Sequence, residues 1–252
     1  MDSKRIQPFI HENRISWTMT TNAYKFYTLN LIAWLKLAKV PWTLCVICCD
    51  TESYTFFRRE GVPCLAYAIE TSKGQQALSP FGSAEFSKWN RKKVELLLWF
   101  TRICPEIGVK ESLYLDGDII VHQDPWMFLE GETDLIFQCD CVGPEVHSNC
   151  GSICSGVIFQ KQTGDQKIID LYTFDKEDWD AAERQDQVYI ANRLRKFNIP
   201  FYTLNRQLFG NGHIQMSGIW KTNPWVLLHY NYRQGDTKKQ AMKAAGHWKL
   251  PY

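Results

Sequence analysis

Long apolar runs are what this 252-residue sequence most clearly lacks. A helix that crosses a bilayer needs roughly 20 consecutive apolar residues, and the longest apolar run here has six, at 44–49. The N-terminal residues MDSKRIQPFI contain no apolar segment of the kind that a signal peptide needs. We therefore expect neither a membrane span nor a secretory leader.

An excess of charge of either sign is also missing. Lys and Arg number 29 and Asp and Glu number 27, which gives a formal net charge of +2. A protein that binds a nucleic acid through its phosphates carries a clear basic excess. We therefore expect no nucleic-acid partner.

Two phosphate-binding signatures are absent as well. The sequence has no Gly-x-Gly-x-x-Gly and no Gly-x4-Gly-Lys, which excludes the common dinucleotide oxidoreductases and P-loop enzymes. The nine cysteines show no disulfide framework, and Cys139, Cys141, Cys150 and Cys154 lack the paired spacing of a zinc ribbon. We therefore expect reduced thiols and a cytosol-like compartment.

The sequence does have the alternating apolar segments of an α/β protein, with 45% hydrophobic and 14% aromatic residues. Short β-branched runs predict strands, and runs with apolar residues three and four apart predict helices. No repeat or linker divides the chain, so we predict one domain. Strands are expected at 14–21, 42–49, 64–69, 112–121, 134–140, 155–161, 200–204 and 225–229, and helices at 23–39, 51–60, 84–104, 165–174 and 181–196.

An acidic pair, Asp116 and Asp118, comes directly after the apolar residues Leu113–Leu115. Residues i and i+2 of a strand share a face, so we expect both carboxylates on one face where the strand opens into a loop. Gly117 between them allows a ligand to approach closely. Oxygen ligands in this arrangement suit Mg²⁺ or Mn²⁺. The chain has a second such triplet, Asp178-Trp179-Asp180, but it follows no apolar strand and is interpreted as the acidic start of a helix.

The string LYLDGDIIVHQDP resembles the metal-binding Asp-x-Asp segment of nucleotide-sugar glycosyltransferases with the GT-A fold. Four further segments agree in order: FGSAEFSKWNRKKVELLL, SICSGVIFQK, RQDQVYIANRL and HYNYRQGDTKKQAMKAAGHW. The sequence is similar to the nucleotide-diphospho-sugar transferases, and among them to glycosyltransferase family 77. The resemblance spans about 14–248. It implies a Rossmann-like α/β mixed sheet with helices on both faces, in which about 1–121 bind the nucleotide and about 122–252 bind the acceptor.

The same resemblance implies a metal centre and a diphosphate site. Asp116, Asp118 and His229 would bind Mn²⁺ or Mg²⁺, although a buried, hydrogen-bonded histidine is the alternative for His229. Gly235 and Lys238 match the Gly-x-x-Lys segment that approaches the diphosphate. Because the distance in sequence from His229 to Gly235 is longer than in bacterial galactosyltransferases, Lys239 is an alternative to Lys238.

Residues after the first two strands are expected to bind the nucleotide. Asp50 would accept a hydrogen bond from uracil or ribose. A helix N-cap is the alternative role for Asp50 and for each of Thr20, Thr21, Asn22 and Tyr24. One basic residue of the predicted 84–104 helix would face the phosphates, with a solvated helix face as the alternative. The candidates for the nucleotide sugar, beside Asp50 and the acidic segment Asp116-Gly117, are Thr20, Thr21, Asn22, Tyr24, Arg91, Lys92, Ser155, Gly156, Gly235 and Lys238.

Asp186 and Gln187 resemble the pair that lies under the sugar ring in retaining enzymes. A front-face mechanism needs no nucleophile, whereas an inverting enzyme needs a carboxylate base near the acceptor hydroxyl. Asp140, Asp186 and Glu145 are the candidate carboxylates, and the sequence does not choose between the mechanisms.

These patterns predict a Mn²⁺- or Mg²⁺-dependent glycosyltransferase that moves a sugar from a UDP-linked donor, UDP-xylose or UDP-galactose, to a glycan acceptor. A sugar nucleotidyltransferase or a phosphatase is the alternative enzyme, and a nucleotide- or carbohydrate-binding module is the alternative without catalysis. Because no anchor is visible, we expect a soluble viral (chlorovirus-like) or bacterial member that acts in the cytoplasm, the host's if the chain is viral.

Overall fold

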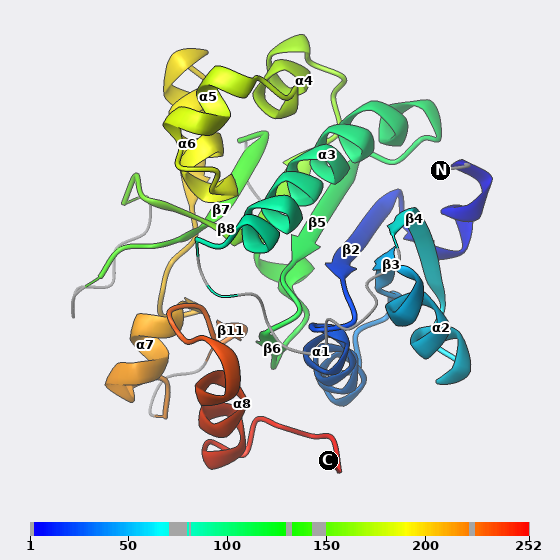
Figure 1. The fold of residues 1–252 in the computed structure, drawn as a ribbon, viewed down its shortest axis with the longest axis vertical. Helices are drawn as coiled ribbons and strands as arrows, with labels where there is room; N and C mark the ends of the chain where they lie inside the picture. The colour runs from blue at the N-terminus through cyan, green and yellow to red at the C-terminus, as the bar shows by residue number, and fades with distance from the viewer. Residues whose placement is uncertain are drawn as a thin grey trace.

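The computed structural model describes residues 3–70, 80, 82–129, 133–142, 150–221 and 225–251. Its centre is a mixed sheet of eight strands in the order β4-β3-β2-β5-β8-β7-β9, with β1 paired to β2 (Figure 1). Strands β4, β3, β2 and β5 run parallel to one another, β8 lies antiparallel to both β5 and β7, and β9 runs parallel to β7. The strands are β1 (Ile10–His11), β2 (Arg14–Thr20), β3 (Cys45–Asp50), β4 (Cys64–Glu70), β5 (Glu111–Leu115), β7 (Leu135–Cys139), β8 (Ile153–Lys161) and β9 (Tyr202–Thr203).

Helices cover both faces of the sheet, as predicted. Successive side chains of a strand point to opposite faces, so Cys45 and Ile47 of β3 enter one apolar core while Val46 and Cys48 enter the other. The first core is closed by α3 (Ala84–Glu106), α4 (Gln166–Tyr172), α5 (Lys176–Ala181) and α6 (Asp186–Lys196). The second is closed by α1 (Lys25–Leu37), α2 (Thr51–Arg59) and the short helix η3 (Pro125–Phe128).

A second, small sheet lies beyond the carboxyl end of β5. It has the order β10-β11-β6, formed by β10 (Phe209–Gly210), β11 (Leu227–His229) and β6 (Ile119–Val121). The chain passes from β5 of the large sheet to β6 of the small one through residues 116–118. The acidic segment therefore joins the two sheets, and the prediction of one strand over 112–121 is wrong at this point.

Other differences from the predicted elements lie in the second half. The expected helix 181–196 is divided at 182–185, where Glu183 and Arg184 have positive φ of 52° and 60°. Asp178 lies in the first turn of α5, capped by Asp175, which agrees with the structural interpretation of the second acidic triplet. Helices α7 (Gly212–Ser217) and α8 (Gly235–Ala244) were not predicted, and neither were β10 and the 3-10 helices η1 (Ser3–Arg5), η2 (Gln7–Phe9) and η4 (Ile219–Lys221).

Six cysteines carry free thiols, as expected: Cys45, Cys48, Cys49, Cys64, Cys104 and Cys154. The sulfur of Cys150 is instead bonded to the sulfurs of both Cys139 and Cys141, against the expectation of reduced thiols. Among the described residues, no helix combines the length and the apolar character that crossing a bilayer requires.

Candidate active site

A cavity of about 540 Å³ opens where the carboxyl ends of β2 and β5 meet α3, the start of β8, the start of α6 and the segment from β11 to α8. Cavities of 300–1,000 Å³ are typical of small-ligand sites. Most of the residues singled out from the sequence line it: Thr20, Thr21, Tyr24, Asp116, Gly117, Asp118, Asp140, Ser155, Gly156, Asp186, Gln187, His229, Gly235 and Lys238.

Asp116, Asp118 and His229 meet at the floor of this cavity. One possible ligand atom from each lies within 4.8 Å of the others. The pairing of β11 with β6 places His229 opposite Ile119, directly after the acidic segment. His229 Nε2 lies 3.3 Å from Asp118 Oδ1 and 3.7 Å from Asp116 Oδ2. The two carboxylates converge through a turn between sheets rather than through the shared strand face that the sequence suggested.

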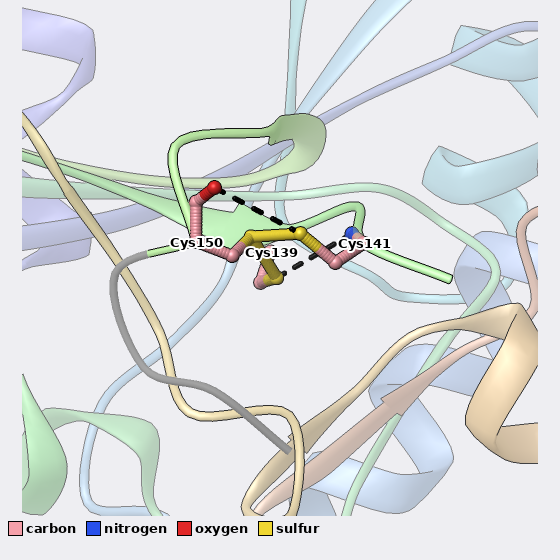
Figure 2. Close-up of side chains that lie close together, drawn as sticks. All are labelled: Cys139, Cys141 and Cys150. Carbon is pink, nitrogen blue, oxygen red and sulfur yellow. Dashed lines mark hydrogen bonds between the residues drawn. A yellow bond between two sulfur atoms is a disulfide. The ribbon is translucent and has the colours of Figure 1, made fainter. Parts of the chain in front are cut away.

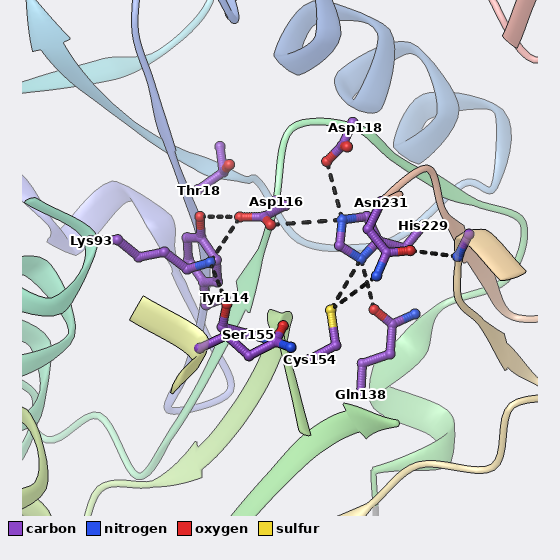
Figure 3. A network of polar contacts seen from close by, with 12 residues as sticks. Thr18, Lys93, Tyr114, Asp116, Asp118, Gln138, Cys154, Ser155, His229 and Asn231 are labelled. Atoms are coloured by element: carbon purple, nitrogen blue, oxygen red, sulfur yellow. Dashed lines mark hydrogen bonds and ion pairs between the residues drawn. The ribbon is translucent and has the colours of Figure 1, made fainter. Parts of the chain in front are cut away.

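Gln138 sets which nitrogen of His229 faces the carboxylates (Figure 3). The Gln138 amide donates to the carbonyl of Gly210 at 3.0 Å, so its oxygen points to His229 Nδ1, 2.8 Å away. Nδ1 therefore carries the proton of a neutral ring, and the lone pair on Nε2 points toward Asp116 and Asp118. A histidine ligand held in this way by a neighbouring oxygen is typical of metal centres.

The donor set fits a hard divalent cation. Two carboxylates and one imidazole nitrogen are ligands that Mn²⁺ accepts readily and Mg²⁺ accepts in part. Burial lowers the pKa of His229, but Asp118 and Cys154 outweigh it and raise the pKa to about 10. Without a metal the ring therefore carries a second proton on Nε2, and a cation bound there would replace this proton. A Cβ on Gly156 would overlap the His229 ring and come within 2.9 Å of Asp116 Oδ2, which explains why a glycine stands beside the site.

Two buried lysines bring positive charge to the same cavity. Lys238 Nζ lies 2.5 Å from Asp118 Oδ2, and Lys93 Nζ lies 3.2 Å from Asp116 Oδ1 and 3.0 Å from Asp186 Oδ2. Burial lowers the pKa of Lys93, but Asp116 and Asp186 outweigh it and keep the pKa above its ordinary value. Burial also lowers the pKa of Lys238, but the negative charge of Asp118 outweighs it and keeps the pKa above its ordinary value. Both amines therefore stay charged.

Lys93 is the basic residue of α3 that enters the cavity, in place of the predicted Arg91 and Lys92. The side chains of Arg91 and Lys92 pair with Glu95 instead. Phe86, Trp89, Asn90 and Lys93 all line the cavity at helical spacing, so the periodicity of α3 would have selected Lys93.

Asp50 and Asn22 lie outside the cavity lining. Asp50 accepts a hydrogen bond from Ser53 N at 2.7 Å and caps α2, and its other oxygen accepts from Asn22 N at 2.7 Å. The N-cap alternative is therefore the one that the structure supports for Asp50. Lys239, the alternative to Lys238, lies over the Trp248 ring at 4.9 Å and does not line the cavity.

The polar wall opposite the acidic pair contains Asp140, Asp186 and Gln187. Lys93 and Ser155 both bind Asp186 through Oδ2, and among the described residues Oδ1 makes no hydrogen bond. Gln187 donates to Asp140 Oδ2 at 2.9 Å, and Tyr232 donates to Asp140 Oδ1 at 2.8 Å. Burial raises the pKa of Asp140 although these hydrogen bonds oppose it.

Asn231 and Tyr232 also line the cavity, as do Tyr114 and Arg233. Asn231 and Tyr232 lie in the segment HYNYRQGDTKKQAMKAAGHW, but the resemblance assigned roles only to the His229, Gly235 and Lys238 positions of that segment. Glu145, the third candidate base, lies outside the described residues.

Comparison with known proteins points in one direction. The family model for nucleotide-diphospho-sugar transferases matches residues 43–242. A UDP-D-xylose:L-fucose alpha-1,3-D-xylosyltransferase, MGP4 of Arabidopsis thaliana, is 26% identical over 199 residues, which are 69% of this chain and 53% of that protein. The chain therefore spans about half the length of this curated relative.

Solved glycosyltransferases share the fold. The galactosyltransferase LgtC, in complex with donor and acceptor sugar analogues, has a TM-score of 0.56 at 13% identity and covers 94% of this chain and 97% of its own. A glycosyltransferase involved in glycosylation of the major capsid of PBCV-1 has a TM-score of 0.54 at 10% identity, with coverages of 92% and 98%. These similarities confirm the predicted GT-A type of α/β fold.

Proposed function

Because this chain belongs to the nucleotide-diphospho-sugar transferase family, we propose that it transfers a sugar from a UDP-linked donor to a hydroxyl group of a glycan. The observation that carries the proposal is the convergence of Asp116, Asp118 and His229 beside two buried lysines in one cavity. Such a set of charges suits a diphosphate that accumulates negative charge as its bond to the sugar breaks.

Asp116, Asp118 and His229 would hold Mn²⁺ or Mg²⁺, which when bound would neutralise charge on the leaving diphosphate. Lys93, beside Asp116, and Lys238, beside Asp118, contribute fixed positive charge. Each lysine is paired with a carboxylate of the acidic segment, so each amine is already in position before the donor arrives. Lysine is well suited to a phosphate as a compact point charge.

Asp186, Gln187 and Asp140 would orient the sugar and the acceptor. Oδ1 of Asp186 is available for a sugar hydroxyl, since Lys93 and Ser155 occupy Oδ2. Burial raises the pKa of Asp140, and a carboxylate is a group that can accept the proton of an acceptor hydroxyl. Both roles are compatible with a front-face mechanism, in which the departing phosphate takes the acceptor proton, and with an inverting one.

We assign nucleotide binding to about 1–121 and acceptor binding to about 122–252. Thr20, Thr21 and Tyr24 line the cavity from the first segment, and Asp140 and Gln187 line it from the second. For the donor we propose UDP-xylose first, because the Arabidopsis relative is named for that donor, and UDP-galactose second. We also propose that the chain acts in a cytoplasm.

The test is metal-dependent donor turnover. The purified chain is incubated with UDP-xylose, UDP-galactose and UDP-glucose, with and without Mn²⁺, and released UDP is measured alone and with fucosides or other glycans as acceptors. We expect Mn²⁺-dependent release of UDP from one donor, increased by an acceptor. Asp118→Asn should lower this rate at least about 100-fold, because it replaces a charged carboxylate ligand of the metal with a neutral amide.

Asp180→Asn is the matched control, because Asp180 belongs to the second acidic triplet. Among the described residues it pairs with the exposed side chains of Lys176 on α5 and Arg184 just after α5. This variant should keep full turnover. UDP binding without any turnover would favour a binding module, and release of inorganic phosphate would favour a phosphatase. Full activity of Asp118→Asn would contradict the metal assignment.

A further inference from the structure

Three cysteines meet at a point separate from the acidic centre. Cys139 ends β7, Cys141 follows two residues later, and Cys150 precedes β8. The structure joins Cys150 Sγ by a disulfide bond to Cys139 Sγ and by another to Cys141 Sγ, and both bonds are drawn in Figure 2. A sulfur atom forms only one disulfide bond, so a single disulfide would leave a third thiol against it. Three sulfurs that face one another in this way have the arrangement of ligands around one centre.

We propose that Cys139, Cys141 and Cys150 bind one Zn²⁺ ion. Thiolates are preferred ligands of zinc, and a site with three protein ligands completes its tetrahedron with water. The site differs in kind from the acidic centre, because soft sulfur ligands select zinc while carboxylates suit Mn²⁺ and Mg²⁺. The two centres would therefore bind different metals in the same chain.

Hydrogen bonds around the sulfurs support thiolate ligands. The backbone N–H of Cys141 donates to Cys139 Sγ at 3.4 Å, and the Thr203 hydroxyl lies 3.8 Å from Cys150 Sγ. Thr203 also accepts from Cys150 N at 2.8 Å, which fixes the third ligand against β9. Outer donors of this kind orient the ligands of a metal and stabilise their charge.

The residues around the three cysteines also suit the charge of a zinc–thiolate group. Three thiolates and one Zn²⁺ carry a net charge of −1. Arg206, which is fully buried, donates to the carbonyl of Cys141, so a positive guanidinium stands beside this charge. Asn211 donates to the carbonyls of Cys139 and Cys141 at 3.1 Å, which holds the two ligands in place from the same side.

The site would also position Asp140, which lies between two of the ligands in sequence and lines the cavity. Zinc would tie the end of β7 to the residues before β8, and would thereby fix the backbone that carries this carboxylate. This consequence rests on the proposed function. The binding of zinc itself does not, so the two can fail separately.

The experiment measures metal in the full chain, purified under reducing conditions with added ZnSO₄ and then freed of loosely bound ions. Elemental analysis should give one zinc per chain for the wild type and for Asp118→Asn, and almost none for Cys150→Ser. Cys104→Ser is the matched control, because Cys104 is a buried free thiol of α3 outside the cluster, and it should retain zinc. Asp118→Asn separates zinc binding from the acidic centre.

A second measurement avoids variants that fail to fold. The wild type, stripped of zinc and loaded with Co²⁺, should show a thiolate-to-cobalt charge-transfer band that Zn²⁺ abolishes. The zinc-loaded, unfolded chain should then titrate nine thiols, the full number in the sequence. Absence of the cobalt band, or seven thiols with a disulfide mapped to Cys150, would overturn the proposal, and so would full zinc retention by Cys150→Ser.

Discussion

At the residue scale, the buried amine of Lys93 links two groups of acidic side chains in the cavity. Its amine bridges Asp116 and Asp186 and also contacts the Ser155 hydroxyl at 3.2 Å. It therefore connects the acidic segment to the polar wall that faces it. Removing one partner of a buried ion pair leaves the other charge uncompensated, which costs about 3–5 kcal/mol.

We predict that Lys93→Met weakens donor binding at least about tenfold, because the diphosphate loses a fixed positive charge. The variant should also unfold at lower temperature, since Asp186 loses its charged partner. Calorimetric titration with UDP and Mn²⁺ measures the first effect, and a thermal melt measures the second.

Lys92→Met is the matched control, because the Lys92 amine pairs with Glu95 and stays outside the cavity lining. It should bind UDP as the wild type does. Equal loss of affinity in both variants would mean that the whole helix face, rather than Lys93, attracts the donor.

At the scale of elements, the C-terminal segment is attached to the body by an aromatic cluster around His247. The His247 ring lies among Trp34, Trp220 and Trp225, with centroid distances of 5.6, 4.6 and 5.6 Å. Tyr230 OH lies 2.7 Å from His247 Nδ1, and the backbone oxygen of His247 accepts from Asn30 and Trp34 on α1. The histidine therefore holds α8 against α1 in its neutral form.

Acid should weaken this attachment. Burial lowers the pKa of His247 to about 4, with a further contribution from Lys249 and His122. Between pH 6.5 and about 4 the unfolded chain binds the proton and the folded chain does not, so stability falls as the pH falls through this window. The free energy of unfolding should decrease by about 3 kcal/mol at most.

The measurement is urea unfolding at several pH values, for the wild type and for His247→Gln. The variant should be less stable at pH 7 and should lose less stability on acidification. Parallel pH profiles for the two proteins would show that His247 does not titrate on unfolding.

The whole molecule builds one site from distant parts of the chain. The cavity is lined by residues from 19 to 238, including Met19, Lys93, Asp140, His229 and Lys238. We therefore expect the two halves to unfold together in one cooperative transition, as single domains usually do.

UDP with Mn²⁺ should shift that transition as a whole. At a ligand concentration about 100 times Kd, binding adds about 2.7 kcal/mol of stability, which raises Tm by roughly 5–10 °C in a chain of this size. Differential scanning calorimetry should show one peak that moves. Two peaks, of which only one moves, would mean that the halves are separate units.

Local patterns in the sequence were sufficient for the central sheet, most of the helices and the position of the acidic segment. Apolar runs and helical spacing are local properties, and burial in a sheet or on one helix face imposes them directly. The resemblance of five ordered segments then identified His229, Asp186 and Gln187 as neighbours of Asp116 and Asp118, and these residues do line one cavity.

Only the tertiary structure decided which side chains meet there. Lys93 replaced Arg91 and Lys92 because the packing of α3 turns that position toward Asp116. Asp50 caps helix α2 and does not line the cavity. Cys150 meets Cys139 and Cys141 because β7 and β8 pair antiparallel. The cysteine cluster depends on strand pairing between distant segments, which no local period encodes. The Asp50 cap and the cavity face of α3 follow local spacing, and only the packing of α3 shows what Lys93 meets. The sequence therefore determined the sheet and the chemistry, and long-range packing decided which charges and sulfurs come together.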